Sequence, residues 1–122
     1  MRGLQKGIEE FNTALYFESH DTLEAVWLDY RGPDRQFFQG LIQIAVGLYH
    51  LSRENSVGAR SQLCKGTEKL KMFRPRHRRV RVDPLLSKVQ AILEAGDNDL
   101  AAGPSPGSPL LLPIIEHDLG TQ

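Results

Sequence analysis

Apolar residues recur at intervals of three and four through most of the first 74 positions, and this spacing predicts helices. Glycine, proline and capping residues fall where the periodic stretches end. The first three predicted helices span about 4–12, 15–30 and 35–53. A fourth begins at Asn55 or Ser56, and a fifth covers about 83–96. No convincing strand is predicted.

The third predicted helix is the most apolar part of the chain. Its sequence FFQGLIQIAVGLYHL is hydrophobic on nearly every side, which is typical of a helix in the middle of a bundle. Gly40 and Gly47 lie seven residues apart on one side of it, and each costs about 1 kcal/mol of helix propensity relative to alanine. We therefore expect a neighbouring helix to cross closely there.

The composition changes after residue 96. DNDLAAGPSPGSP is typical of a linker, whereas LLLPII is too apolar to stay in water and is expected to dock as an extended strap. The predicted fold class is all-α, a compact bundle of about five helices with an extended C-terminal strap. Residues 1–96 form the predicted bundle domain, and 97–122 form the linker and the apolar C-terminal segment.

Polar side chains interrupt the apolar faces of the second and third predicted helices. His20, Glu24 and Trp27 follow steps of four and three, so they share a stripe on the second helix. The third helix carries a comparable polar stripe. A short turn makes these two helices pack antiparallel, which brings the stripes together. The predicted cluster consists of His20, Glu24, Gln39, Gln43 and His50, with Glu18 or Asp21 at its edge.

Three interpretations of this cluster remain open. It could be a hydrogen-bond network that fixes the register of the two helices, with Trp27 packed below it. It could hold a divalent metal through His20, Glu24 and His50, with one coordination position open for water. It could also be a metal-free pocket in which Glu24 and an imidazole exchange protons or bind a small ligand.

A dense basic loop follows the fourth predicted helix. Residues 69–82 carry the basic side chains Lys69, Lys71, Arg74, Arg76, His77, Arg78, Arg79 and Arg81. Such a loop can contact RNA or a nucleotide, and the candidate residues are Arg76, Arg78, Arg79 and Arg81. Aromatic residues do not alternate with the basic ones. The favoured interpretation is therefore a solvated loop that the acidic N-terminal helices partly neutralise.

The net charge, the cysteine content and the absence of a recognised targeting segment limit the partners and the cellular location that we expect. The 122 residues contain 15 Lys and Arg against 15 Asp and Glu, so no whole-molecule field favours nucleic acid or membrane. Cys64 is the only cysteine, which excludes an intramolecular disulfide and fits a reducing compartment. No signal peptide or membrane-spanning run is recognised. We expect a cytoplasmic protein or, after removal of a transit peptide, one of the chloroplast stroma.

Several motifs resemble DUF309, a family of small helical bacterial and plastid proteins of unknown function. The motifs are GIEEFN, FESHDTLEAVW, FFQGLIQIAVGLYHL and N-x-x-GA-x-x-L with KGTEKL, and the similarity is strongest over residues 4–74. HDTLE and the short connection to QGLIQ look most like the cyanobacterial and chloroplast branch. The resemblance implies an all-α bundle without an established reaction. Its motif positions fall on Glu18, His20, Glu24, Trp27, Gln39, Gly40, Gln43, His50, Asn55, Gly58 and Ala59.

Two positions depart from the family pattern. Ala14 stands where glycine is frequent, and Asp21 stands where glutamate is frequent. Overall, the sequence predicts a binding or interaction module whose partner is an unknown protein or small molecule. The alternatives are a metal-dependent or acid/base enzyme, hydrolase-like in its chemistry, and a protein that contacts RNA or a nucleotide.

Overall fold

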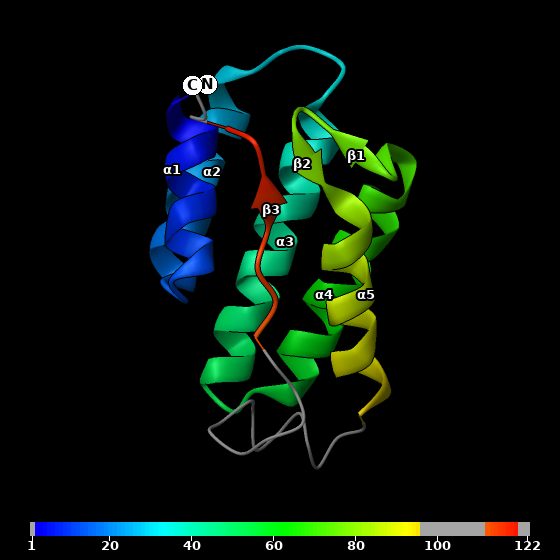
Figure 1. The fold of residues 1–122 in the computed structure, drawn as a ribbon. Helices are drawn as coiled ribbons and strands as arrows, with labels where there is room; N and C mark the ends of the chain where they lie inside the picture. Colours follow the sequence, from blue (N-terminus) through cyan, green and yellow to red (C-terminus); the bar gives the residue numbers. More distant parts are fainter. Residues whose placement is uncertain (1, 96–111, 120–122) are drawn as a thin grey trace.

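The computed structural model describes residues 2–95 and 112–119, and five helices pack together in it (Figure 1). The predicted helical bundle is thus confirmed. None of the helices in these two ranges is long and apolar enough to cross a membrane. The helices are α1 (Arg2–Asn12), α2 (Tyr16–Asp29), α3 (Arg35–Ser52), α4 (Ser56–Leu70) and α5 (Val82–Glu94), with a 3-10 turn, η1, at Lys71–Phe73.

Helix α3 occupies the centre of the bundle, as its apolar sequence predicts. In Figure 1, α1 and α2 lie on one side of it, and α4 and α5 lie on the other. Gly40 and Gly47 face α4: a Cβ atom added there would lie 2.8 Å from Leu70 and 2.7 Å from Leu63. The predicted close crossing is therefore the one between α3 and α4.

The connection between α2 and α3 is held by Arg35. Its Nη1 donates to the carbonyl oxygens of Trp27 (2.9 Å) and Tyr30 (2.7 Å), which lie at the end of α2. The Arg35 guanidinium also lies 4.1 Å from the centre of the Trp27 ring, a cation–π contact. These contacts close the turn and make α2 and α3 antiparallel, as the sequence predicts.

The structure also contains a small antiparallel sheet, so the expectation of no strand is wrong. Strands β1 (Arg76–His77), β2 (Val80–Arg81) and β3 (Glu116–His117) pair in that order. The two-residue turn between β1 and β2 has positive φ angles, 48° at Arg78 and 63° at Arg79. Strands of two residues are too short to show alternation, and the turn lacks the Asn-Gly signal of a hairpin.

The C-terminal strap docks on the helices over the part that the structure describes, 112–119. It runs past α3 and places β3 beside β2 (Figure 1). Ile115 is fully buried, and its N–H and C=O both bond to the side chain of Asn12, at 2.7 and 3.0 Å. The predicted docking of the strap is confirmed for 112–115. Residues 110–111 and the predicted linker at 97–109 lie outside the described residues.

Candidate functional site

The predicted cluster of imidazoles, carboxylate and amides does not form. Glu24 is exposed and makes no hydrogen bond or ion pair within 2–95 and 112–119, and Glu18 and Asp21 are exposed as well. The buried stripe of α2 is Tyr16, Ser19 and Leu23. Each position on a helix turns by about 100°, so Glu24, which follows Leu23, points outward.

The predicted metal site fails for the same reason. Within the described ranges, no three His, Cys, Asp or Glu side chains come together in a way that could hold a metal ion. His20, Glu24 and His50 are therefore not a ligand set. The glutamines do not find the expected partners either: Gln39 and Gln43 are half-buried, and Gln43 Oε1 is buried without a hydrogen-bond partner among the described residues.

His20 and His50 line the same pocket, although no contact between the two rings is found in the described residues. The antiparallel packing of α2 and α3 places the start of α2 beside the end of α3, and a pocket of about 200 Å³ lies between them. Its lining residues are Phe17, His20, Val46, Tyr49 and His50. We call it the α2–α3 pocket.

Aromatic rings follow one another along the wall of this pocket. The ring centres of Phe17 and His20 lie 5.3 Å apart, those of Phe17 and Tyr49 lie 5.7 Å apart, and those of Tyr49 and His50 lie 6.2 Å apart. These separations are typical of packed aromatic pairs. Trp27, which the sequence analysis placed below the cluster, instead lies at the far end of α2 under Arg35.

The wall of the α2–α3 pocket is almost entirely carbon, so the imidazoles contribute ring carbons to it. Phe17, in this wall, is 46% exposed. Elsewhere on the surface, Leu15 in the turn before α2 is 46% exposed, and Val57 at the start of α4 is 81% exposed. Exposed apolar groups around a hollow mark a binding surface more often than a catalytic centre.

Hydrogen bonds hold each imidazole in one orientation. His20 Nδ1 lies 3.0 Å from the carbonyl oxygen of Phe17. His50 Nδ1 lies 3.2 Å from Nδ2 of Asn55, the residue that caps α4 by accepting a bond from Gly58 N–H (3.1 Å). A Cβ atom on Gly58 would lie 2.6 Å from Asn55 Nδ2 and 2.9 Å from the His50 ring. Glycine at 58 thus leaves room for the contact between Asn55 and His50.

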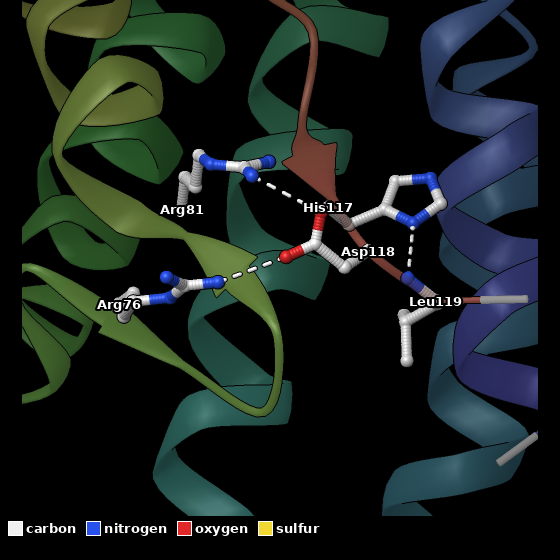
Figure 2. Close-up of polar contacts among 5 residues, drawn as sticks. All are labelled: Arg76, Arg81, His117, Asp118 and Leu119. Carbon is white, nitrogen blue, oxygen red and sulfur yellow. Dashed lines mark hydrogen bonds and ion pairs between the residues drawn. The ribbon is translucent and has the colours of Figure 1, made fainter. Parts of the chain in front are cut away.

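The basic loop is neutralised by acids other than those predicted. Asp118, on the strap, accepts bonds from Arg76 (2.9 Å) and Arg81 (3.0 Å), as Figure 2 shows. Asp34, just before α3, accepts bonds from His77 (2.9 Å) and Arg78 (2.5 Å). The expectation that the acidic N-terminal helices neutralise this loop is therefore wrong.

These ion pairs change the acidity of both carboxyl groups. Burial by itself would raise the pKa of Asp34, but the bonds from Arg78 and His77 outweigh it and the pKa falls below its usual value. The bond from Arg81 is the largest cause that lowers the pKa of Asp118; it outweighs the effect of burial, and the charges of Arg81 and Arg76 lower the pKa further. Three of the four arginines proposed for nucleic acid thus hold the fold together. Of these four, only the Arg79 side chain, in the turn, makes neither an ion pair nor a hydrogen bond among the described residues, while its backbone carbonyl accepts from Asp118 N–H (3.0 Å). Phosphate contact stays a prediction.

Other hollows are larger but more open. Grooves of about 410, 550 and 520 Å³ lie between α4 and α5, between α1 and α2, and along α3 and α4. None of them contains His20 or His50. The α2–α3 pocket is the more enclosed hollow, so it is the better candidate for a site with a defined occupant.

Comparison with known proteins identifies a domain that covers the first helices. Residues 4–62 match DUF309, a domain of unknown function. The match covers just under half of the chain and includes most of α1, all of α2 and α3, and the first part of α4. All five residues that line the α2–α3 pocket fall within it.

One curated relative is YpuF, an uncharacterized protein of Bacillus subtilis (strain 168). It is 34% identical over 74 residues, which cover 60% of this chain and 41% of YpuF. The chain thus spans about two fifths of the length of that relative. Neither comparison assigns a reaction, a ligand or a partner.

The sequence pattern missed most of the pocket wall. Phe17 and Tyr49 were not among the candidate residues, although each lies three positions or fewer from an imidazole that was. Asn55 was recognised as a helix cap, but its contact with His50 was not. Asp118 pairs with Arg76 and Arg81, which lie 42 and 37 positions away in the sequence. No local sequence pattern predicts pairs at such separations.

Proposed function

We propose that this protein is a protein-interaction module and that the α2–α3 pocket takes up one apolar side chain of a partner. The observation that carries the proposal is the pocket itself, a hollow of about 200 Å³ with a carbon wall and two imidazoles in it. Pockets for drug-sized ligands and cofactors are typically about 300–1,000 Å³. One leucine-sized group suits the smaller volume better.

The surroundings support a protein as the partner. Binding energy at protein interfaces concentrates in a few side chains that fill pockets, ringed by contacts that exclude water. Phe17, which lines this pocket, is 46% exposed and supplies apolar surface at its rim. A carbon wall offers little for proton transfer, so binding is favoured over the acid/base alternative.

We also propose that the family relation extends past residue 62. Helix α4 continues without a break to Leu70, where it packs against Gly40 of α3.

The sequence motifs resemble the cyanobacterial and chloroplast branch, which would place the protein in the cytoplasm or the chloroplast stroma. Microscopy of the full-length chain, tagged at its C-terminus in the organism of origin, tests this placement.

A fragment titration tests the binding proposal. We expect N-methyl-4-methylpentanamide, which carries a leucine-like isobutyl group, to shift the NMR signals of Phe17, Val46 and Tyr49 in a saturable manner. Val46→Phe, which fills the pocket, should abolish these shifts. Ala91→Phe places the same ring in the groove between α4 and α5 and should leave them intact. Shifts centred elsewhere, or shifts unaffected by Val46→Phe, would contradict the proposal.

A further inference from the structure

We infer that the C-terminal strap, residues 112–119, is an internal ligand, and that the site it fills also binds an extended acidic segment of a partner protein. The strap is held through its main chain, through a buried side chain and through one carboxylate. Proteins that recognise strand-like peptides use the same combination, with main-chain bonds for affinity and side-chain contacts for specificity. The site shares no residue with the wall of the α2–α3 pocket, so this inference goes beyond the proposed function.

The strap site, which consists of Asn12, Arg76 and the stretch 79–81, binds the main chain of its occupant. The side chain of Asn12 forms two bonds at Ile115: Oδ1 accepts from the N–H (2.7 Å), and Nδ2 donates to the C=O (3.0 Å). Farther along, β3 pairs with β2, and the N–H of Asp118 donates to the carbonyl oxygen of Arg79 (3.0 Å). These bonds involve only the backbone of the strap, so another extended chain can form them as well.

Burial alternates along the strap and sets one side-chain requirement. Pro113 and Ile115 are buried, whereas Leu112 and Ile114 are 45% and 50% exposed. This is the period of an extended segment with one face against the protein. The position of Ile115 therefore requires an apolar side chain, and the position of Ile114 does not.

Two arginines set the second requirement. Oδ2 of Asp118 accepts from Arg76 (2.9 Å) and Oδ1 accepts from Arg81 (3.0 Å), and Figure 2 shows the carboxylate between the two guanidinium groups. One carboxylate faces two positive charges there, so the charge of the site complements an acidic occupant. The expected motif is an apolar residue followed three positions later by aspartate or glutamate.

The strap is held loosely enough for exchange. Within 112–119 only Pro113 and Ile115 are buried. The side chains of Asp118, Arg76 and Arg81 are 43%, 56% and 39% exposed, so their ion pairs add little. A segment with so few buried contacts opens without unfolding of the whole domain. Once the strap leaves, the vacated edge of β2 has N–H and C=O groups with which another strand can pair.

The strap also makes partner binding conditional. It belongs to the same chain as its site, so it competes there at an effective concentration of about millimolar. A partner segment that meets only one of the two side-chain requirements loses to the strap. A segment that meets both, or a change that weakens the strap at Ile115 or Asp118, shifts the competition toward the partner.

A fluorophore-labelled peptide with blocked ends that copies residues 112–119, LPIIEHDL, tests this inference by fluorescence anisotropy with full-length chains. We expect Ile115→Ala, which weakens the internal strap, to bind the peptide at least about tenfold more tightly than the wild type does. Ile114→Ala changes the exposed neighbour and should bind as weakly as the wild type. Asp118→Asn leaves the buried isoleucine in place and should give an intermediate affinity, so it serves as the test if Ile115→Ala does not fold.

Altered peptides test the two side-chain requirements on the Asp118→Asn chain. A peptide with Ile115→Ala should lose saturable binding, whereas one with Ile114→Ala should bind like the parent peptide. Asp118→Asn in the peptide removes the charge that faces Arg76 and Arg81 and should weaken binding by about fivefold.

Hydrogen exchange shows where the peptide binds. Unlabelled peptide added to the Asp118→Asn chain should speed the exchange of the chain's own amides at positions 115 and 118, because the displaced strap loses its bonds to Asn12 and Arg79. Val46→Phe, which fills the α2–α3 pocket, should leave peptide binding unchanged. Failure of this inference is therefore distinguishable from failure of the proposed function.

Three results would overturn the inference: no saturable binding by either weakened chain, binding that leaves the exchange of both amides unchanged, and binding that Val46→Phe abolishes. A wild-type dimer in analytical ultracentrifugation that excess peptide dissociates would assign the site to the strap of a second copy, and the assignment to a different partner would then be wrong. Binding that requires the isoleucine at position 115 of the peptide and releases the internal strap supports the inference.

Discussion

At the scale of single residues, Gly58 has a role that helix propensity would not reveal. Replacing a glycine inside a helix by alanine normally gains up to about 1 kcal/mol. At position 58 the new Cβ would lie 2.6 Å from Asn55 Nδ2, so the cap of α4 must shift. We expect Gly58→Ala to lose about 1 kcal/mol of unfolding free energy, the usual value of a cap, and to shift the His50 ring signals.

Chemical denaturation with tryptophan fluorescence measures this loss. Ser61→Ala, on the exposed face of the same helix, is the matched control and should be neutral or slightly stabilising. A gain in stability for Gly58→Ala, with unchanged His50 signals, would show that the cap and the imidazole tolerate the added methyl group.

Asp34 carries a pH dependence of stability. Its pKa lies below the usual 3.8, so the native state favours the ionised form. The resulting stabilisation is fully present above the unfolded-state pKa and is lost as the pH falls through the lower, native one. We expect Asp34→Asn to cost about 2 kcal/mol at pH 7, because Arg78 and His77 lose a charged acceptor.

Urea unfolding at pH 7 and at pH 3 tests this expectation. The difference between wild type and Asp34→Asn should shrink at pH 3, where the wild-type carboxyl group begins to take up its proton. Asp29→Asn removes an exposed carboxylate of α2 and should cost little at either pH. A difference of the same size at both pH values would mean that the ionised form is not what stabilises the native state.

At the scale of elements, the strap offers a matched pair of adjacent residues. Ile115 is fully buried, whereas Ile114 is 50% exposed. Truncating a buried isoleucine to alanine typically costs 2–5 kcal/mol, because apolar contact is lost and a cavity remains. We expect Ile115→Ala to lose about 2–4 kcal/mol and Ile114→Ala to lose less than about 0.5 kcal/mol, both measured by thermal or urea unfolding. Equal effects would show that the strap does not pack as described.

The helices and the strap can be predicted from the sequence, whereas the sheet cannot. The helices follow from apolar periodicity and from breakers such as Gly32 and Pro33, and the strap follows from the apolar run in LLLPII. The sheet does not, because its strands have two residues each and β3 comes from a distant part of the chain.

The candidate site follows from the sequence only in part. Antiparallel packing correctly predicts that the start of α2 lies beside the end of α3, where His20 and His50 line one pocket. A stripe drawn through His20 and Glu24, however, does not show which side of α2 faces α3. One step of about 100° separates the buried Leu23 from the exposed Glu24.

At the scale of the whole molecule, the neutral net charge is reached by local pairing. Basic side chains of the β1–β2 hairpin form ion pairs with Asp34 and Asp118. Asp34 lies just before α3, and Asp118 lies on the strap. An arginine already bound to a carboxylate releases few counterions when a phosphate approaches. The fold therefore reduces the affinity for nucleic acid that the sequence of the hairpin alone would predict.

This argument gives a measurable salt dependence. We expect the wild-type protein to bind single-stranded RNA weakly, with a shallow slope of log K against log salt concentration. Asp118→Asn releases Arg76 and Arg81, and each new phosphate contact should steepen the slope by about 0.7, so by up to about 1.4 for two contacts. Fluorescence anisotropy over a salt series measures the slope. Asp29→Asn changes the net charge equally but lies on α2, and its slope should match that of the wild type. Tight wild-type binding with a steep slope would instead mean that phosphate outcompetes Asp118 for these arginines, and the RNA interpretation of the hairpin would then be correct.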